Sequence, residues 1–205
     1  MAVRWIFFDV GSTLVDETEA YDHRARDMLA GTGISFRAFD NKRRELAGQG
    51  LDGNSEAIRY FGLTKTPWHS EDEIPYADAW ETLECLKNRG YHLGIIANQV
   101  PGTVQRLTAW GLLKYFRVVA TSAELGAAKP EPLIFQKAFK MAGCAAEEAV
   151  MVGDRLDNDI IPAKSVGMKT VWIRKGLSSY QNPMFGQNCA DWSIEELADL
   201  KSIFP

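Results

Sequence analysis

Cysteine is scarce in this sequence of 205 residues. Cys85, Cys144 and Cys189 are widely separated and form no CxxC pair. A disulfide framework normally needs an even number of cysteines, and a zinc site needs closely spaced ligands. We therefore expect neither, and a reducing, cytoplasmic compartment fits this composition.

Long apolar runs are also missing. A membrane-spanning helix needs about 20 consecutive apolar residues, and no segment approaches that length. A secretory signal peptide needs an unbroken apolar stretch near the N-terminus, where this chain carries Arg4 and Asp9. We therefore expect a soluble chain without a membrane partner.

An excess of positive charge is absent, because 23 Lys and Arg face 27 Asp and Glu, for a net charge of -4. Proteins that hold nucleic acid by neutralising phosphates carry clustered excess Lys and Arg. We therefore expect no nucleic-acid partner. The length allows one core of about 100–200 residues, or one core with a smaller module.

What the sequence does contain is an alternation of short apolar runs and helical segments. Five runs rich in Val and Ile predict buried strands at Arg4–Phe8, His92–Ala97, Arg117–Thr121, Ala149–Val152 and Lys169–Ile173. Helical spacing follows between the later ones, at Val104–Trp110, Leu133–Ala142 and Asp159–Val166. Strands that alternate with helices form a parallel sheet covered on both faces. The predicted fold is therefore an α/β core with a Rossmann-like parallel sheet.

The segment from Glu17 to Glu73 breaks this alternation, because it is polar and has helical rather than strand patterns. It is interpreted as a small α-helical cap inserted after the first strand. The core then consists of residues 1–16 and 74–205. The return of the chain to the core is marked by Pro75, which cannot continue a helix. A new helix is then predicted at Ala79–Arg89.

Polar residues follow several predicted strands at the point where each strand ends. Asp9 ends the first strand, Asn98 follows the second and Asp154 ends the fourth. Ligands of open parallel sheets bind beyond these carboxyl ends. Asp154 and Asp159 are separated by one strand-to-helix turn, which can direct both carboxylates at one cation. With Asp9 they suit Mg²⁺, which prefers oxygen ligands.

Lys129 lies in the loop beyond the third predicted strand and, taken alone, would be interpreted as an ordinary surface lysine. The charges of the site give a reason to expect it there. The three carboxylates repel one another and raise their own pKa values unless cations compensate them. Mg²⁺ and the lysine together balance the three negative charges. The sequence therefore predicts both cations in the site.

Other polar motifs are interpreted as structural. Asp157 and Asn158 are expected to cap the helix after the fourth strand, and Ser193–Glu196 fits a capping box for a terminal helix. The basic run Arg37–Arg44 is interpreted as a solvated helix face. The histidines are scattered, with no protease or zinc motif around them, so structural or surface roles are expected for His23, His69 and His92.

Four segments together resemble the ordered motifs of the haloacid dehalogenase-like hydrolase superfamily. They are Phe7–Asp16, Ile95–Asn98, Lys129-Pro130 with Ile134-Phe135, and Gly153-Asp154 with Asp159. The resemblance covers the whole chain, and segment 17–73 resembles the helical cap that one large subgroup inserts after the first motif. Motifs in this order are far more specific than any one alone.

The resemblance implies a Mg²⁺-dependent phosphatase for a small phosphorylated or other anionic substrate. Asp9 would attack phosphorus and form an aspartyl-phosphate, and Lys129 would neutralise the nucleophile and the phosphoryl oxygens. Asp9, Asp154 and the backbone carbonyl of Gly11 would hold Mg²⁺. Asp159 would act on the metal directly or through water. The residues expected at the phosphoryl group are Gly11, Ser12, Asn98 and Lys129.

Two residues depart from the family pattern. The second residue after the nucleophile is normally another aspartate, which protonates the leaving oxygen and then activates water, and here it is Gly11. The usual Ser or Thr of the second motif is Ala97. Acid–base assistance is worth about 10²–10⁴-fold, so we expect slow hydrolysis of poor leaving groups. Gly11→Asp is expected to raise the rate of hydrolysis of alkyl phosphates, whose leaving groups are poor.

Three functions therefore stay open: a phosphatase of reduced power or unusual substrate, a metal-binding pseudo-phosphatase or interaction protein, and a non-phosphatase branch such as a phosphonate hydrolase. The last would use a cap lysine as a Schiff base, for which Lys42 and Lys65 are the candidates by region. Dehalogenation is disfavoured, because that branch does not need the metal-binding motif at Asp154. The substrate and the oligomeric state are not determined by the sequence.

Overall fold

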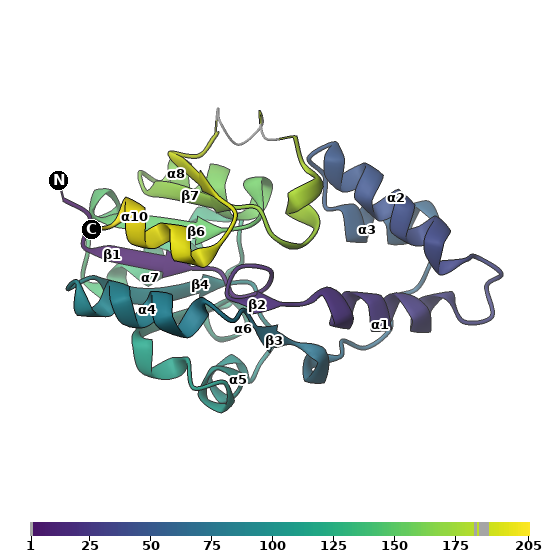
Figure 1. The fold of residues 1–205 in the computed structure, drawn as a ribbon, viewed down its shortest axis with the longest axis horizontal. Helices are drawn as coiled ribbons and strands as arrows, with labels where there is room; N and C mark the ends of the chain where they lie inside the picture. Colours follow the sequence, from purple (N-terminus) through teal and green to yellow (C-terminus); the bar gives the residue numbers. More distant parts are fainter. Residues whose placement is uncertain (1, 183, 185–188) are drawn as a thin grey trace.

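The computed structural model describes residues 2–182, 184 and 189–205. Within these residues one parallel sheet has the strand order β5-β4-β1-β6-β7-β8. Figure 1 shows its central strands β4, β1, β6 and β7. Its strands are β1 (Trp5–Phe8), β4 (His92–Ala97), β5 (Phe116–Thr121), β6 (Ala149–Gly153), β7 (Lys169–Ile173) and β8 (Trp192–Ile194). The sheet extends from β1 to β4 and β5 on one side and to β6, β7 and β8 on the other. The strand order therefore reverses at β1, which is where α/β sheets bind ligands.

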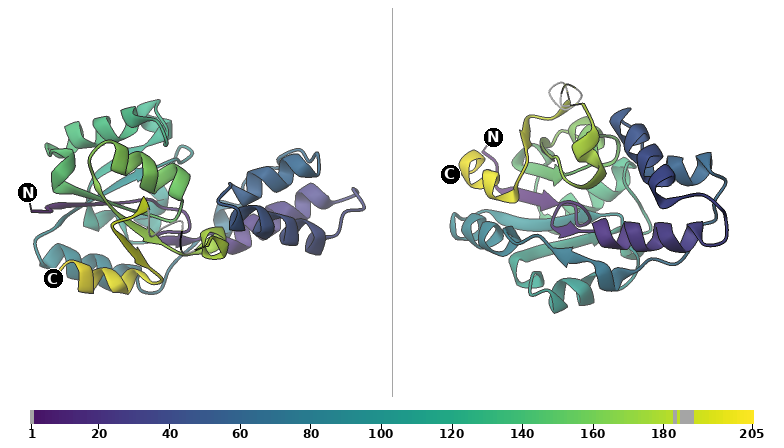
Figure 2. Two further views of the ribbon diagram at one scale, coloured as in Figure 1. Left: turned by 90° about the horizontal axis from the view of Figure 1, so that it is seen from above. Right: turned by 45° about the vertical axis from the view of Figure 1, so that its right-hand side comes forward.

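Helices cover both faces of the sheet (Figure 2). One face packs on α4 (Ala79–Asn88), α5 (Thr103–Ala109) and α10 (Leu200–Ile203), and the other on α7 (Pro132–Ala142) and α8 (Ile161–Ser165). Successive residues of a strand point to opposite faces. In β1, Ile6 and Phe8 accordingly pack in the first cluster, while Trp5 and Phe7 pack in the second. This burial on both faces explains why the strand is apolar throughout.

The cap contains α1 (Thr18–Leu29), α2 (Phe36–Gly48) and α3 (Gly53–Tyr60), which lie to one side of the sheet (Figures 1 and 2). These helices share a small apolar cluster of their own, centred on Phe39. The chain leaves the core through β2 (Val15–Asp16) and returns through β3 (Ile74–Pro75), and the two strands pair antiparallel. We propose that the cap and core divide at this pair, so that the core is 1–16 and 74–205.

Shorter elements connect these layers. They are α6 (Ser122–Leu125), the π-helix η4 (Leu156–Ile160) and the 3-10 helices η1 (Ser70–Asp72), η2 (Leu113–Tyr115), η3 (Ala146–Glu148), η5 (Gly176–Tyr180) and η6 (Leu197–Asp199). No helix in the described part of the chain is long and apolar enough to cross a membrane. All three cysteines are free.

The five predicted strands are confirmed to within a residue at each end, but β8 was missed. The predicted capping box at Ser193–Glu196 is wrong, because Ser193 lies in β8 and pairs with Trp172 of β7. The N-cap of η6 is instead Glu196, three residues further on. The carboxylate of Asp199, in the first turn of η6, accepts hydrogen bonds from the backbone N–H groups of Glu195 and Glu196. A strand of three residues is too short for its pattern to be recognised, and its neighbour β7 decides the structure.

Candidate active site

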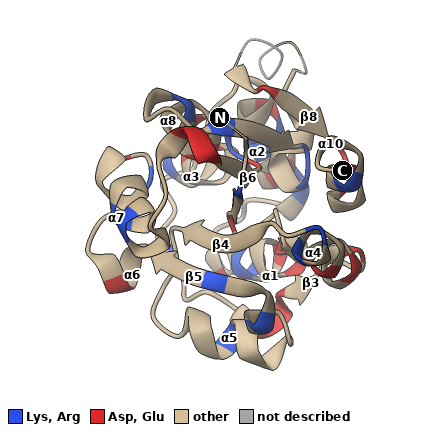
Figure 3. Ribbon diagram, turned by 90° about the vertical axis from the view of Figure 1, so that its left-hand side faces the viewer, with Lys and Arg blue, Asp and Glu red and all other residues tan. Residues whose placement is uncertain are grey.

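The predicted site residues meet at the carboxyl edge of the sheet. Asp9 follows β1, Lys129 lies in the loop after α6, Asp154 follows β6 and Asp159 lies in η4. Oxygen atoms of the three carboxylates lie within 4.8 Å of one another. Figure 3 shows acidic and basic residues mixed on the elements around the sheet, so a local cluster rather than one charged face is the distinctive feature.

Lys129 joins this cluster through its side chain. Its Nζ donates to Asp9 Oδ1 and to Asp159 Oδ1, each at 2.6 Å, and its side chain is 0% exposed. Burial alone lowers the pKa of Lys129, but the charges of Asp159 and Asp9 outweigh it and raise the pKa above its usual value. The ammonium group therefore stays charged and compensates two carboxylates that would otherwise repel each other.

Asn98 fixes the position of Lys129 through the backbone. Its side-chain oxygen accepts from the Lys129 N–H, and its side-chain nitrogen donates to the Lys129 carbonyl, both at 2.8 Å. The peptide bond between Lys129 and Pro130 is cis. The Asn98 side chain therefore holds the backbone of Lys129 in place at the end of β4.

Two carboxylates of the cluster, Asp9 and Asp154, have raised pKa values. Burial raises the pKa of Asp9 to about 6, against the opposing effect of Lys129 and with a further contribution from Asp159. Burial, followed by the charges of Asp159 and Asp9, raises the pKa of Asp154 well above its usual value. The Asp154 carboxylate has no hydrogen-bond partner among the described residues. Such a set of hard oxygen donors, one of them unpartnered, fits Mg²⁺.

The turn after β6 aims Asp159 at the cluster. Asp159 Oδ2 accepts the backbone N–H of Arg155 at 3.0 Å, and a Cβ on Gly153 would lie 2.5 Å from the Asp159 side chain. Glycine is therefore required there by space. The prediction that Asp157 and Asn158 cap the next helix is wrong. Asp157 pairs with the Arg155 guanidinium at 2.7 Å, Asn158 lines a cavity, and the chain enters α8 through the π-helix η4.

Glu17 is a site residue that sequence reasoning missed. A Cβ built on Gly11 would lie 2.4 Å from both Glu17 carboxylate oxygens, so Glu17 fills the space that a side chain at position 11 would occupy. Burial raises the pKa of Glu17 to about 8, with smaller contributions from the charges of Asp9 and Glu73. No local motif points to Glu17, which the sequence pattern places as the first residue of the cap.

A cavity of 180 Å³ lies over the cluster and is lined by Asp9, Gly11, Ser12, Glu17, Asn98 and Asp154, among others. Ser12 has a φ of +52°, the only positive φ among the described residues other than glycine. Such backbone angles are uncommon and cluster at functional sites. Ser12 also lines a second cavity of 290 Å³ between cap and core, together with Arg43, Arg44 and Lys175.

The basic residues of the cap divide into different groups. The interpretation of Arg37–Arg44 as a solvated face is wrong for Arg43, which is 4% exposed and pairs with Asp22 and with Asp40. Lys42 pairs with Glu45 at 2.7 Å and does not line the cavity over Asp9. Lys65 lines a neighbouring cavity of 330 Å³ that also contains Glu17 and Asn98.

Comparison with known proteins gives a consistent result. A family model described as haloacid dehalogenase-like hydrolase matches residues 6–173. A glyceraldehyde 3-phosphate phosphatase of Methanocaldococcus jannaschii is 39% identical and covers 98% of this chain and 96% of its own. A pyrophosphatase of Bacillus velezensis is 29% identical, and the match covers 97% of this chain and 94% of that protein. A phosphatase from Thermococcus onnurineus, known from a crystal structure, is 31% identical in sequence. Its structure matches with a TM-score of 0.68 and covers 99% of this chain and 97% of its own.

Proposed function

The chain belongs to the haloacid dehalogenase-like hydrolases and is a phosphatase, and we propose that it hydrolyses small phosphate esters with Mg²⁺ and with Asp9 as nucleophile. The observation that carries the proposal is the ammonium group of Lys129, which lies 2.6 Å from both Asp9 and Asp159 at the end of the sheet. A buried lysine that holds a carboxylate ionised at a ligand cavity is suited to phosphoryl transfer, which depends on positioning and charge stabilisation.

Asp9 would attack phosphorus in line, forming an O–P bond while the bond from phosphorus to the leaving oxygen breaks. Water then attacks the aspartyl-phosphate and releases phosphate. Lys129 binds an oxygen of the transferred group as charge develops on it. The backbone N–H groups at Ser12 and Asn98 would bind the other phosphoryl oxygens, because both residues line the cavity over Asp9.

Asp9, Asp154 and the Gly11 carbonyl would hold Mg²⁺, with Asp159 acting directly or through water. When bound, the ion supplies positive charge that stabilises the phosphoryl oxygens. Asp159 has two hydrogen bonds that fix it, from Lys129 and from the Arg155 N–H. Its main contribution is therefore to position Lys129.

Glu17 would replace the aspartate that is missing at position 11. Its carboxyl group fills the space beside Gly11 and lines the same cavity as Asp9. Glu17 would protonate the leaving oxygen and then accept a proton from the attacking water. A pKa of about 8 means that much of this group is protonated near neutral pH, as the first of these steps requires. Glu17 directly precedes α1, so the acid–base group would enter the site with the cap.

The substrate is proposed to be a small phosphorylated metabolite in the cytoplasm. The cavity between cap and core is lined by Arg44 and Lys175 beside Ser12. The two cations pair with Asp40 and Glu196, and they would turn toward a second anionic group of the substrate. The relatives named for glyceraldehyde 3-phosphate and for pyrophosphate act on compact anions of this kind. A phosphonate hydrolase with Lys65 as its Schiff base is the alternative, because Lys65 lines the cavity that adjoins Glu17.

The test is a screen of alkyl, aryl and acyl phosphates, pyrophosphate and phosphonates, with and without Mg²⁺. We expect Mg²⁺-dependent release of phosphate from at least one ester. Asp9→Asn should abolish it, whereas the control Glu84→Gln, an exposed carboxylate on α4, should not change it. Activity that survives Asp9→Asn would exclude the covalent mechanism. Cleavage of phosphonates alone, lost in Lys65→Met, would favour the alternative.

A further inference from the structure

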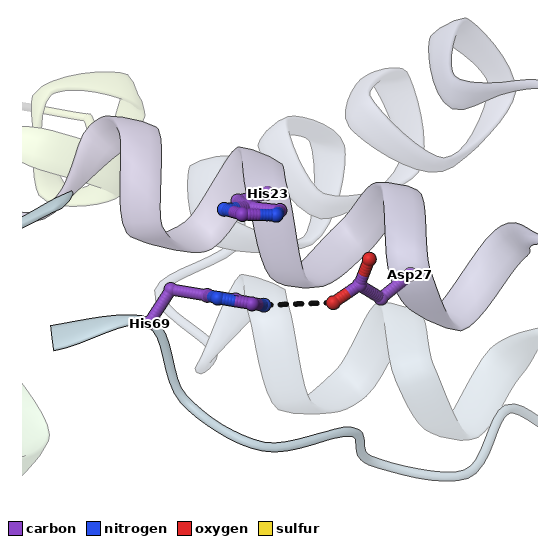
Figure 4. Close-up of side chains that lie close together, drawn as sticks. All are labelled: His23, Asp27 and His69. Carbon is purple, nitrogen blue, oxygen red and sulfur yellow. Dashed lines mark hydrogen bonds and ion pairs between the residues drawn. The ribbon is translucent and has the colours of Figure 1, made fainter. Parts of the chain in front are cut away.

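A second group of metal-binding side chains lies in the cap, away from the catalytic carboxylates. His23 and Asp27 both belong to α1 and are four residues apart, so they lie on one side of the helix. His69 comes from the segment that leads back to the core, just before η1. One ligand atom from each of the three residues lies within 4.8 Å of the others. Figure 4 shows the two imidazole rings stacked, with the Asp27 carboxylate turned toward them.

Each imidazole is oriented by a carboxylate at its Nδ1 atom. His23 Nδ1 lies 2.8 Å from Asp72 Oδ2, and His69 Nδ1 lies 3.1 Å from Glu71 Oε1. His69 Nε2 contacts Asp27 Oδ2 at 2.7 Å, and His23 Nε2 has no hydrogen-bond partner in the described part of the chain. Histidines that bind metals almost always donate their other ring N–H to a carboxylate or a carbonyl. Both rings of this group already have that arrangement.

The charge around the two rings also favours a cation. Asp27, Glu71 and Asp72 surround them, whereas the arginines of α1 are engaged elsewhere. Arg24 lies over the Trp68 ring, and Arg26 lies over Phe36 and 4.0 Å from Glu19. The imidazole rings are stacked with centroids 3.6 Å apart, an arrangement in which two positive charges would repel each other. One bound divalent ion would balance the carboxylates without charging both rings.

We propose that His23, Asp27 and His69 form a site for Zn²⁺ or a similar transition-metal ion, distinct from the Mg²⁺ site of the core. Two imidazole nitrogens and one carboxylate are ligands that Zn²⁺ accepts, whereas Mg²⁺ prefers oxygen alone. The ion would replace the proton between His69 and Asp27, and the rings would tilt so that both nitrogens point at it. Three protein ligands leave one position for water. The site is accessible, because the His23 side chain is 45% exposed.

The position of this site gives it a consequence for the cap. Asp27 and His69 are 42 residues apart in sequence, and they belong to the outgoing helix and the returning segment of the cap. A metal ion that binds both would tie these two segments together close to the pair of strands β2 and β3. The bound ion would therefore stiffen the cap on the side where it joins the core.

The experiment is a titration with Co²⁺ and Zn²⁺, followed by equilibrium dialysis and by the visible absorption of Co²⁺. It is done in excess Mg²⁺ with the Asp154→Asn protein, so that the core carboxylates do not contribute. We expect one equivalent to bind. His23→Gln and His69→Ala should each weaken binding by more than the roughly 10–100-fold that loss of a supporting partner costs. Asp72→Asn, which removes only such a partner, should fall within that range.

The matched control is His92→Gln, which removes the third histidine of the chain, on β4. It should bind Co²⁺ as tightly as the parent protein. His23 is partly exposed, so His23→Gln is expected to fold, and unchanged melting in the absence of metal verifies this. The proposal is overturned if the parent protein binds no equivalent of Co²⁺. It is also overturned if His92→Gln loses as much affinity as His23→Gln, or if His23→Gln loses none.

Discussion

Moving the carboxylate from position 17 to position 11 tests the proposed role of Glu17 most directly. Three variants are needed: Glu17→Ala, Gly11→Asp and the double variant. Glu17→Ala removes the proposed acid–base group and opens the space beside Gly11. Gly11→Asp adds a carboxylate where the family normally has one, but its Cβ would lie 2.4 Å from the Glu17 carboxylate. The double variant, like the wild type, has one carboxylate in this space, now at position 11, and it has no clash.

The expected effects follow from the geometry. Glu17→Ala should lower kcat for an alkyl phosphate by about 10²–10⁴-fold, which corresponds to about 3–5 kcal/mol of barrier. An aryl phosphate, whose leaving group needs no proton, should lose much less. In Gly11→Asp alone the end of the flexible Glu17 side chain must move away from the new Cβ, so the variant should be destabilised by only about 1 kcal/mol and should gain no activity. This prediction differs from the expectation from sequence that the single change raises alkyl phosphate hydrolysis.

The double variant should recover part of the activity on alkyl phosphates that Glu17→Ala loses, and it should melt above Gly11→Asp. The two changes are then strongly non-additive, as expected for residues that share one space. The assay is kcat for one alkyl and one aryl phosphate at saturating Mg²⁺, with melting temperature as the control for folding. Glu17 is not the acid–base group if Glu17→Ala lowers kcat equally for both substrates, or if the double variant recovers none of the lost kcat for the alkyl phosphate.

Three further outcomes test the site. Mg²⁺ should raise the melting temperature of the wild type, because it binds only the folded state, and Asp154→Asn should abolish the effect; equal shifts in both proteins would place the metal elsewhere. Lys129→Met should lower the free energy of unfolding by about 3–5 kcal/mol, since it leaves buried carboxylates unpaired, and urea denaturation without a shift in midpoint would contradict this. The folded protein without metal holds a proton on Glu17, whose pKa is raised from 4.5 to about 8, so its stability should fall as pH rises from 4.5 to 8. Glu17→Gln should flatten that decline in thermal melts, and an unchanged slope would show that the pKa of Glu17 is not raised.

Sequence reasoning succeeded where a short segment decides the structure. Asp9 and Asp154 directly follow apolar strands, and parallel strands bring their carboxyl ends to one edge of the sheet. The same rule placed Asn98 and Lys129 at that edge. It did not reveal that the Asn98 side chain holds the Lys129 backbone, because two hydrogen bonds between separate loops leave no periodic signal.

The turn after β6 shows the limit of local rules. Asp157 and Asn158 have the residue types and the position of helix caps, which is why they were assigned to that role. The π-helix η4 changes where the backbone donors point, and the Arg155 guanidinium takes Asp157 as its partner. Which local hydrogen bond forms is therefore decided by the neighbouring charges.

The sequence by itself determined the α/β core through its apolar periodicity, and it indicated the family and the cluster of Asp9, Lys129, Asp154 and Asp159 through four short motifs in a fixed order. Only the tertiary structure brought Glu17 into the space beside Gly11 and stacked His23 on His69. Both arrangements depend on how the inserted helices pack against the core and on each other. Such contacts join distant segments through shape and charge, and one sequence records no pattern for them.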